Sequence, residues 1–130
     1  MSKPRGSQRL LVVDDDENMR TMLVCTLERD GYHVDTAEDG VEGLRLLRAI
    51  KYDLLISDNQ MPRLTGLEMI KHLHSERIQL PIIMATTSLK PEDLAGVEFP
   101  AVKLLIKPYT LVELLTLVRN ELTTAGADQK

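Results

Sequence analysis

Short apolar runs recur along the chain, and segments in which apolar residues repeat every three or four positions lie between them. Four of these runs, at 10–13, 54–56, 82–85 and 104–106, contain no alternating polar positions. Such runs are typical of parallel strands buried on both faces beneath helices. A fifth run, at 32–37, is more polar and predicts a strand at the edge of the sheet.

The intervening segments predict helices. The apolar stripes are Met19/Met22/Leu23/Leu27, Val41/Leu44/Leu47/Ile50, Leu67/Ile70/Leu73 and Leu111/Leu114/Leu115/Val118/Leu122. Asp30 and Gly31 predict the end of the first helix, and Thr110 is a suitable N-cap for the last. A weaker segment near 89–99 contains Gly96 and is followed by Pro100, so we expect about two turns or an irregular segment there.

Strands that alternate with helices predict one doubly wound (βα)₅ domain of the α/β class. Helices would cover both faces of a five-stranded parallel sheet, and the fourth helix would be short or irregular. We expect a disordered tail at 1–8, the domain at 9–123, and a disordered tail or the start of a linker at 124–130. The length of 130 residues suits a single domain with its own core.

Composition excludes several classes of protein. Lys and Arg number 16 against 20 Asp and Glu, a net charge of −4, which argues against direct binding of nucleic acid. No apolar run approaches the roughly 20 residues that span a bilayer, so we expect no insertion into a membrane. Cys25 is the single cysteine, which excludes a disulfide framework and fits a reducing cytoplasm; we expect it to be buried in the first helix.

Candidate chemistry follows the buried runs. Asp14, Asp15 and Asp16 come after the first strand, Ser57 and Asp58 end the third, Thr86 and Thr87 end the fourth, and Lys107 and Pro108 end the fifth. In an open parallel sheet the carboxyl ends of the strands form the ligand-binding rim, so these groups would converge. Clustered carboxylates repel one another unless a proton or a metal neutralises them, and a hard cation such as Mg²⁺ meets that need.

The same residues resemble a known family. The segments 11–16 (LVVDDD), 58–62 (DNQMP) with Gly66, 81–86 (PIIMAT) and Lys107–Pro108 resemble a bacterial two-component response-regulator receiver domain, similar to the chemotaxis regulator. The resemblance spans about residues 8–123 and implies a flavodoxin-like sheet of strand order 2-1-3-4-5.

The resemblance implies a role for each site residue. Asp58 would be the phosphoacceptor, and Thr86 and Lys107 would bind phosphoryl oxygens. Asp15 would ligate Mg²⁺ (or Mn²⁺) directly, Asp14 would hold it largely through water, and Asp58 and the main-chain carbonyl of Gln60 would complete the set. The Lys107–Pro108 peptide is expected to be cis.

The resemblance also implies partners and a cytoplasmic location. The phosphoryl donor would be a histidine kinase or a histidine phosphotransfer protein, and the signal would pass to an output domain or a downstream protein. Leu104 stands where the family usually has an aromatic residue, so the switch and any homodimer surface would be atypical. Thr87 stands at a position that is usually small and would narrow the access to Asp58.

Competing interpretations of these residues are weaker. Asp16 fits a helix N-cap better than a ligand. Asp14, Asp16 and Asn18 imitate a calcium loop, but Met19 and Cys25 stand where that loop needs Gly and Glu. His72 and His74 are two residues apart and cannot share a metal easily on a helix.

Two other functions remain open on the sequence alone. Asp14–Asp15–Asp16 resembles the motif of haloacid-dehalogenase-type aspartyl phosphatases, although Asn18 stands where these have Thr or Val. The chain could also be a receiver-fold interaction module that is not phosphorylated.

Overall fold

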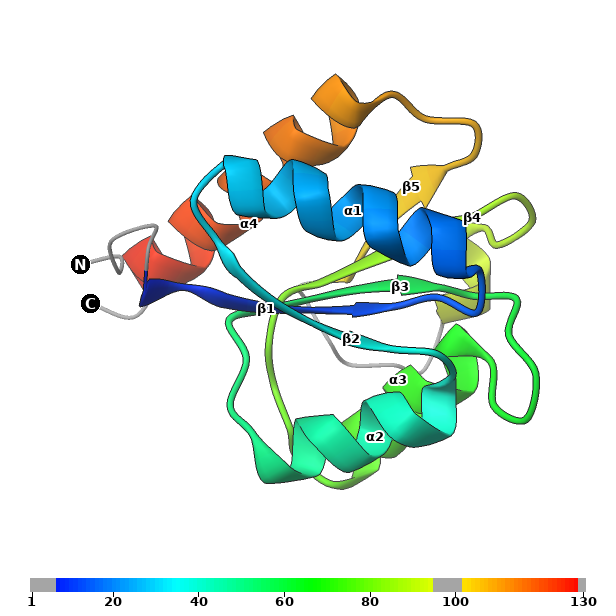
Figure 1. Cartoon of the computed structure of the whole chain (residues 1–130). Helices are drawn as coiled ribbons and strands as arrows, with labels where there is room; N and C mark the ends of the chain where they lie inside the picture. The colour runs from blue at the N-terminus through cyan, green and yellow to red at the C-terminus, as the bar shows by residue number, and fades with distance from the viewer. Residues whose placement is uncertain (1–6, 95–101, 129–130) are drawn as a thin grey trace.

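The computed structural model describes residues 7–94 and 102–128, with the backbone alone for 124–128. A five-stranded parallel sheet of order β2-β1-β3-β4-β5 forms the middle layer, which confirms the predicted fold class and strand order (Figure 1). The strands are β1 Arg9–Val13, β2 His33–Ala37, β3 Leu54–Asp58, β4 Ile82–Thr86 and β5 Val102–Ile106. The α-helices within the described ranges are α1 Glu17–Arg29, α2 Gly40–Ala49, α3 Gly66–Ser75 and α4 Leu111–Asp128.

Helices cover both faces of the sheet, α1 and α4 on one and α2 and α3 on the other (Figure 1). Alternate strand residues feed two separate cores. Leu11 and Leu55 belong to the core under α2 and α3, whereas Leu10 and Leu54 belong to the core under α1 and α4. These four side chains are fully buried, and each contributes about 1.5–3 kcal/mol by leaving water. The unbroken apolar runs of β1, β3 and β4 therefore follow from burial on both faces. The run at 104–106 was expected to be buried in the same way, but it lies in β5 at the edge of the sheet, where Ile106 is 55% exposed.

Side-chain caps fix where the helices begin. Asp16 accepts hydrogen bonds from the amides of Asn18 and Met19 at the start of α1, as predicted. Thr110 and Glu113 exchange bonds between side chain and backbone at the start of α4, which confirms Thr110 as its cap. Because a cap places the first turn of a helix, these bonds also set where each loop on the carboxyl rim ends.

The predicted fourth helix is a short 3₁₀ turn, η2 (Pro91–Leu94), and Gly96, Phe99 and Pro100 lie outside the described residues. The predicted N-terminal tail lies mostly outside them as well, but Gln8 is buried and its carbonyl accepts a bond from the His33 amide. The backbone of 124–128 continues α4, where the sequence predicted a tail or a linker.

Cys25, which was expected to be buried, is exposed, because α1 buries the face that carries Leu23 and Leu27. Three residues of the predicted apolar stripes, Met22, Val41 and Leu111, are exposed as well. In α2, for example, Leu44 and Leu47 are buried while Val41 is 49% exposed. These differences arise because helical spacing alone does not fix which side of a helix a marginal position takes.

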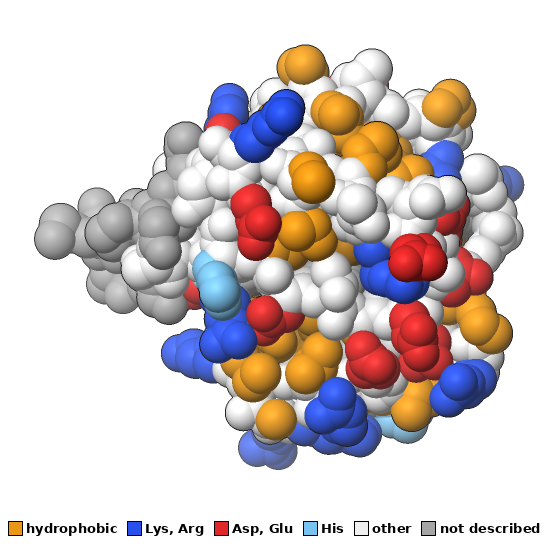
Figure 2. All heavy atoms as spheres, viewed as in Figure 1, with side chains coloured by type: hydrophobic (Ala, Val, Ile, Leu, Met, Phe, Trp, Pro, Cys, Tyr) orange, Lys and Arg blue, Asp and Glu red, His pale blue; other side chains and the backbone are white. Residues whose placement is uncertain are grey.

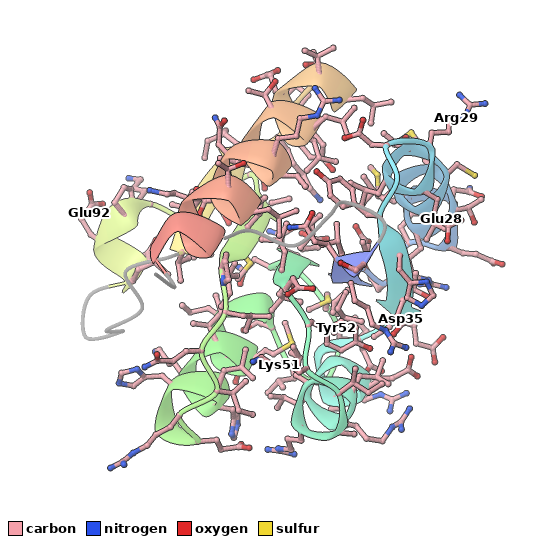
Figure 3. All side chains as sticks on the ribbon, turned by 90° about the vertical axis from the view of Figure 1, so that its left-hand side faces the viewer. Glu28, Arg29, Asp35, Lys51, Tyr52 and Glu92 are labelled. Carbon is pink, nitrogen blue, oxygen red and sulfur yellow. The ribbon has the colours of Figure 1, made fainter. Side chains whose placement is uncertain are left out.

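A polar cluster joins β1, β2 and the residues before β3, away from the carboxyl rim. Arg9 Nε donates to Asp35 Oδ2 at 2.9 Å, and the Tyr52 hydroxyl donates to the same oxygen at 2.7 Å. Asp35 and Tyr52 lie side by side in Figure 3. The guanidinium of Arg9 also lies over the Tyr52 ring, 5.7 Å from its centre. The cluster ties β1 and β2 to the segment that leads into β3.

Candidate phosphoacceptor site

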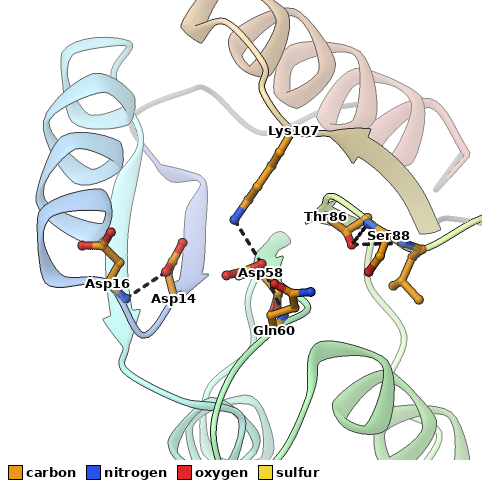
Figure 4. A network of polar contacts seen from close by, with 9 residues as sticks. Asp14, Asp16, Asp58, Gln60, Thr86, Ser88 and Lys107 are labelled. Carbon is orange, nitrogen blue, oxygen red and sulfur yellow. Dashed lines mark hydrogen bonds and ion pairs between the residues drawn. The ribbon is translucent and has the colours of Figure 1, made fainter.

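The predicted site residues converge at the carboxyl ends of the strands. Asp14 follows β1, Asp58 ends β3, Thr86 ends β4, and Lys107 follows β5. Figure 4 shows them gathered at one end of the sheet, with the Lys107 ammonium directed at Asp58 and the Thr86 hydroxyl bonded to the loop after β4. Parallel register brings these ends to one level, since Val13 pairs with Ser57 and Asp58 pairs with Ala85. The rim that the sequence predicted is therefore present.

Three carboxylates crowd this rim. Asp14, Asp15 and Asp58 each offer an oxygen, and these three oxygens lie within 4.8 Å of one another. Asp14 and Asp58 are buried, whereas Asp15 is exposed. Acidic side chains also gather on the right-hand side of the face shown in Figure 2, toward the carboxyl ends of β1 and β2. Such crowding of like charges favours a cation or a proton.

The pKa of Asp14 is raised above its usual value. Burial is the largest cause, and the charges of Asp58 and Asp15 act in the same direction. The hydrogen bond from the Asp16 amide to Asp14 Oδ1, at 2.9 Å, and the charge of Lys107 oppose the rise. Carboxylate oxygens are hard ligands that Mg²⁺ and Mn²⁺ prefer, and a bound cation would offset the unfavourable burial of their negative charge. The residues present therefore fit the predicted cation.

Lys107 forms an ion pair with Asp58. Its Nζ is 3.2 Å from Asp58 Oδ1, and its side chain is only 27% exposed. The Lys107–Pro108 peptide is cis, as expected. The ammonium therefore faces the carboxylate that would receive a phosphoryl group, and it can compensate negative charge there.

Thr86 is buried, and its hydroxyl oxygen accepts hydrogen bonds from the amides of Ser88 and Leu89 at 3.1 and 3.2 Å. These bonds use the oxygen as an acceptor, so the hydroxyl hydrogen can be donated to another oxygen. Thr86 thus links the loop after β4 to the rim. Thr87 is exposed and lines an adjoining cavity of about 560 Å³ together with Met19 and Tyr109.

Gln60 follows the phosphoacceptor candidate in an exposed loop. Its amide donates to Asp58 Oδ1 in a long bond of 3.4 Å. This places the Gln60 backbone beside the Asp58 carboxylate.

Sequence reasoning missed two residues that hold the rim. Arg20 Nη1 donates to the main-chain carbonyl of Asp14 at 2.7 Å, and Asn59 bonds to the first turn of α3 through both its carbonyl and its side chain. The position of Asn59 directly after the candidate phosphoacceptor was the available signal. Its partners, Gly66 and Leu67, come from a helix whose approach the sequence does not specify.

A family model described as the response regulator receiver domain matches residues 10–119. The chain belongs to this family. Receiver domains act in two-component signalling, and the crowded Asp14, Asp15 and Asp58 fit a phosphoacceptor site of that kind. This membership decides against the haloacid-dehalogenase-type phosphatase.

Curated relatives of this receiver domain are response regulators. The chain is 35% identical over 130 residues to the alkaline phosphatase synthesis transcriptional regulatory protein PhoP of Bacillus subtilis, covering 95% of the chain and 54% of PhoP. It is 42% identical over 114 residues to the response regulator MprA of Mycobacterium ulcerans, covering 87% of the chain and 49% of MprA. The chain thus spans about half the length of these relatives.

Solved structures resemble the receiver domain over most of its length. The chemotaxis protein CheY4 of Vibrio cholerae matches with a TM-score of 0.78 and 34% identity, over 88% of this chain and 98% of CheY4. The response regulator TrrA of Thermotoga maritima, solved in complex with Mg²⁺–BeF, matches with a TM-score of 0.75 and 31% identity, over 87% and 97%.

None of the helices in the described part of the receiver domain combines the length and the hydropathy needed to cross a membrane.

Proposed function

We propose that Asp58 is the phosphoacceptor of this receiver domain and takes a phosphoryl group from a histidine kinase or a histidine phosphotransfer protein. The observation that carries the proposal is the position of the Asp58 carboxylate. It lies 3.2 Å from the ammonium of Lys107, and one of its oxygens lies within 4.8 Å of oxygens of Asp14 and Asp15. Donor groups for phosphoryl oxygens and ligands for a cation therefore flank one buried nucleophile.

Asp14, Asp15, Asp58 and the main-chain carbonyl of Gln60 would hold Mg²⁺. When bound, the ion supplies positive charge that offsets the carboxylates and the transferred phosphoryl group. The crowding of the three carboxylates and the raised pKa of Asp14 support this assignment. TrrA, which was solved with Mg²⁺–BeF, supports it from a related chain.

The transfer needs one nucleophile and one leaving group. An oxygen of the Asp58 carboxylate forms a bond to phosphorus while the bond from phosphorus to the donor imidazole nitrogen breaks, and the imidazole leaves with that electron pair. Lys107 stays close to the acceptor oxygen and pairs with the negative phosphoryl oxygens. The product is an acyl phosphate on Asp58, so the chain changes its own state and turns over no external substrate.

The switch would begin at Thr86. Its hydroxyl now accepts bonds from the amides of Ser88 and Leu89, and a phosphoryl group on Asp58 would offer it a charged acceptor. Movement of Thr86 toward that acceptor would pull on the loop after β4. The population of the two states would shift by the difference in these contacts.

Partners and location follow from this reading. A histidine kinase or a histidine phosphotransfer protein would supply the phosphoryl group in the cytoplasm. An output domain or a downstream protein would receive the signal. Among the relatives, the name of PhoP describes a transcriptional regulatory protein. Neither direct binding of nucleic acid nor insertion into a membrane is proposed for this domain.

The test is intact mass after incubation with acetyl phosphate, with and without Mg²⁺. We expect one added phosphoryl group that requires Mg²⁺ and is absent in Asp58→Asn, which keeps the size of the side chain but removes its charge. Addition of the group to Asp58→Asn would assign the acceptor elsewhere. No addition from acetyl phosphate or from a histidine-kinase donor, together with no binding of Mg²⁺, would identify an interaction module that is not phosphorylated.

A further inference from the structure

Asn59, in the loop after β3, forms hydrogen bonds through its amide, its carbonyl and its side chain. Its amide donates to the carbonyl of Ala85 at 3.3 Å, so it extends the β3–β4 ladder by one residue. Its own carbonyl accepts from the Gly66 amide at 2.9 Å, and its side-chain Oδ1 accepts from the Leu67 amide, also at 2.9 Å. One residue therefore joins the end of β3 to the first two amides of α3.

These bonds close the loop that carries the proposed chemistry. Residues 60–65 lie between the two bonded ends and include Gln60, whose carbonyl is a proposed ligand for Mg²⁺. The third amide of α3 is satisfied independently, because Glu68 donates to the Thr65 hydroxyl at 3.1 Å and Thr65 in turn donates to the Glu68 carboxylate. The helix thus has its own cap, and the Asn59 bonds act on the loop as well as on the helix.

The start of α3 also packs closely against the backbone of Asp58. A Cβ added at Gly66 would come within 2.6 Å of the Asp58 carbonyl oxygen and 2.6 Å of Met84 Sδ. The Asp58 carbonyl accepts a further bond from the buried Ser57 hydroxyl at 2.8 Å. Any shift of α3 relative to β3 would therefore move the backbone of Asp58.

We propose that Asn59 is a positioning residue, whose side-chain oxygen holds the 59–66 loop so that the Asp58 carboxylate and the Gln60 carbonyl face the cation together. This inference rests on the proposed function of the same site. It assigns to Asn59 an effect on the binding of Mg²⁺ that a helix cap alone would not have. Ligand-supporting residues of this kind typically alter metal affinity strongly when they are replaced.

Three variants separate this role from simple capping. Asn59→Leu keeps the volume of the side chain but removes the acceptor. Thr65→Ala removes the other side-chain acceptor at the start of α3 and is the matched control for lost helix capping. Asn59→Asp keeps an acceptor oxygen and tests rescue. The melting temperature of each variant, measured without Mg²⁺, reports the cost of the lost bond.

The dissociation constant for Mg²⁺ is then measured by titration with MgCl₂, followed through the backbone amide signals of the loop in NMR spectra. We expect Asn59→Leu to raise this constant about tenfold. Thr65→Ala should leave it unchanged despite a similar fall in melting temperature, and Asn59→Asp should bind Mg²⁺ at least as tightly as the wild type. Phosphoryl uptake from acetyl phosphate at low Mg²⁺ should fall with affinity.

Three results would overturn the inference while leaving the proposed function in place. They are wild-type affinity in a folded Asn59→Leu, an equal loss of affinity in Thr65→Ala, or an Asn59→Asp as weak as Asn59→Leu. If instead the wild-type chain binds no Mg²⁺ and takes up no phosphoryl group, the proposed function fails and the inference fails with it. The wild-type titration therefore distinguishes the two failures.

Discussion

The ammonium nitrogen of Lys107 lies 3.2 Å from Asp58 Oδ1, and it reaches that oxygen from beyond the end of β5. Lys107 thus compensates the negative charge of one of the three crowded carboxylates. Its ammonium also lies beside the oxygen that would accept the phosphoryl group. Loss of the ammonium should therefore hinder phosphoryl transfer but favour the binding of a cation, which makes Lys107 a sensitive probe of the site.

Replacement of Lys107 by Ala should slow phosphoryl uptake from acetyl phosphate by about tenfold or more, because a fixed cation is lost where charge develops. Binding of Mg²⁺ should become tighter, since the competing positive charge beside Asp58 is gone. The measurements are the initial rate by intact mass and an NMR titration with MgCl₂. Lys103→Ala, a change at an exposed position of β5, is the control and should alter neither. Weaker binding of Mg²⁺ in Lys107→Ala would contradict this electrostatic account.

Asp14 should make the stability of the cation-free domain depend on pH. The pKa of Asp14 is raised in the folded state, chiefly by burial. Protonation of Asp14 therefore contributes to the free energy of unfolding fully below the pKa of the unfolded chain, and this contribution is lost as pH rises through the pKa of the folded state. Asp14→Asn should therefore raise the melting temperature at pH 7 in EDTA and have little effect at acidic pH. Asp93→Asn, on the exposed turn η2, provides a comparison. A fall in melting temperature at pH 7 would refute this assignment.

The same Asp14 variant should lose the stabilisation that Mg²⁺ gives to the wild type. A ligand that binds only the folded state raises the melting temperature according to its concentration and affinity. We expect MgCl₂ to raise the melting temperature of the wild type and to have a much smaller effect on Asp14→Asn. Equal shifts in the two proteins would place the cation elsewhere.

The end of α3 offers a stabilising substitution. Arg77 adopts a left-handed backbone conformation, with φ of 59°, and its amide bonds to the His74 carbonyl while the Ile78 amide bonds to the Leu73 carbonyl. Glycine is the usual residue at this position of such a helix end. Arg77→Gly should raise the free energy of unfolding by about 0.5–1 kcal/mol, measured by urea denaturation. Lys71→Gly, inside the same helix, should lower it by about 1 kcal/mol.

The cluster at the other end of the sheet should contribute to stability and not to chemistry. Tyr52→Phe removes the hydroxyl that donates to Asp35 and should lower the free energy of unfolding by about 1–2 kcal/mol. Phosphoryl uptake should not change. A double-mutant cycle with Asp35→Asn would isolate the pairwise energy, and a coupling near zero would contradict the assignment.

The Tyr52 contribution should also depend on pH. Burial and the bond to Asp35 raise the pKa of Tyr52 well above its usual range. A raised folded pKa means that the contribution is complete below the unfolded value of about 10 and declines as pH rises beyond it. The stability difference between wild type and Tyr52→Phe should therefore be constant through neutral pH and shrink in alkaline solution. A difference that grows above pH 10 would have the wrong sign.

Much of this molecule could be predicted from local sequence. The apolar runs predict the strands: β1, β3 and β4 have no polar alternation because they are buried on both faces, and the more polar run at 32–37 forms the edge strand β2. Asp16 and Thr110 specify helix starts because their side chains bond to amides within the same turn. The order Asp14–Asp15, Asp58, Thr86 and Lys107 after successive runs indicates a shared rim, since parallel strands end on one side of a sheet.

Other features depend on how distant segments meet. The prediction that Cys25 is buried was wrong, because the burial of a marginal helical position depends on how the helix is rotated against the sheet. The partners of Asn59 could not be predicted either, because Gly66 and Leu67 reach it only once α3 packs beside β3.

Which residue types follow each strand can be seen in the sequence alone, and they indicate the class of chemistry and the family. How far these residues lie from one another, and which of them are buried, depends on the folded arrangement. Charge interactions and desolvation vary with distance and environment across the whole fold, so they cannot be derived from local sequence. Asp14 shows the difference: its identity is local, but its raised pKa comes from burial and from Asp58, a residue on another strand.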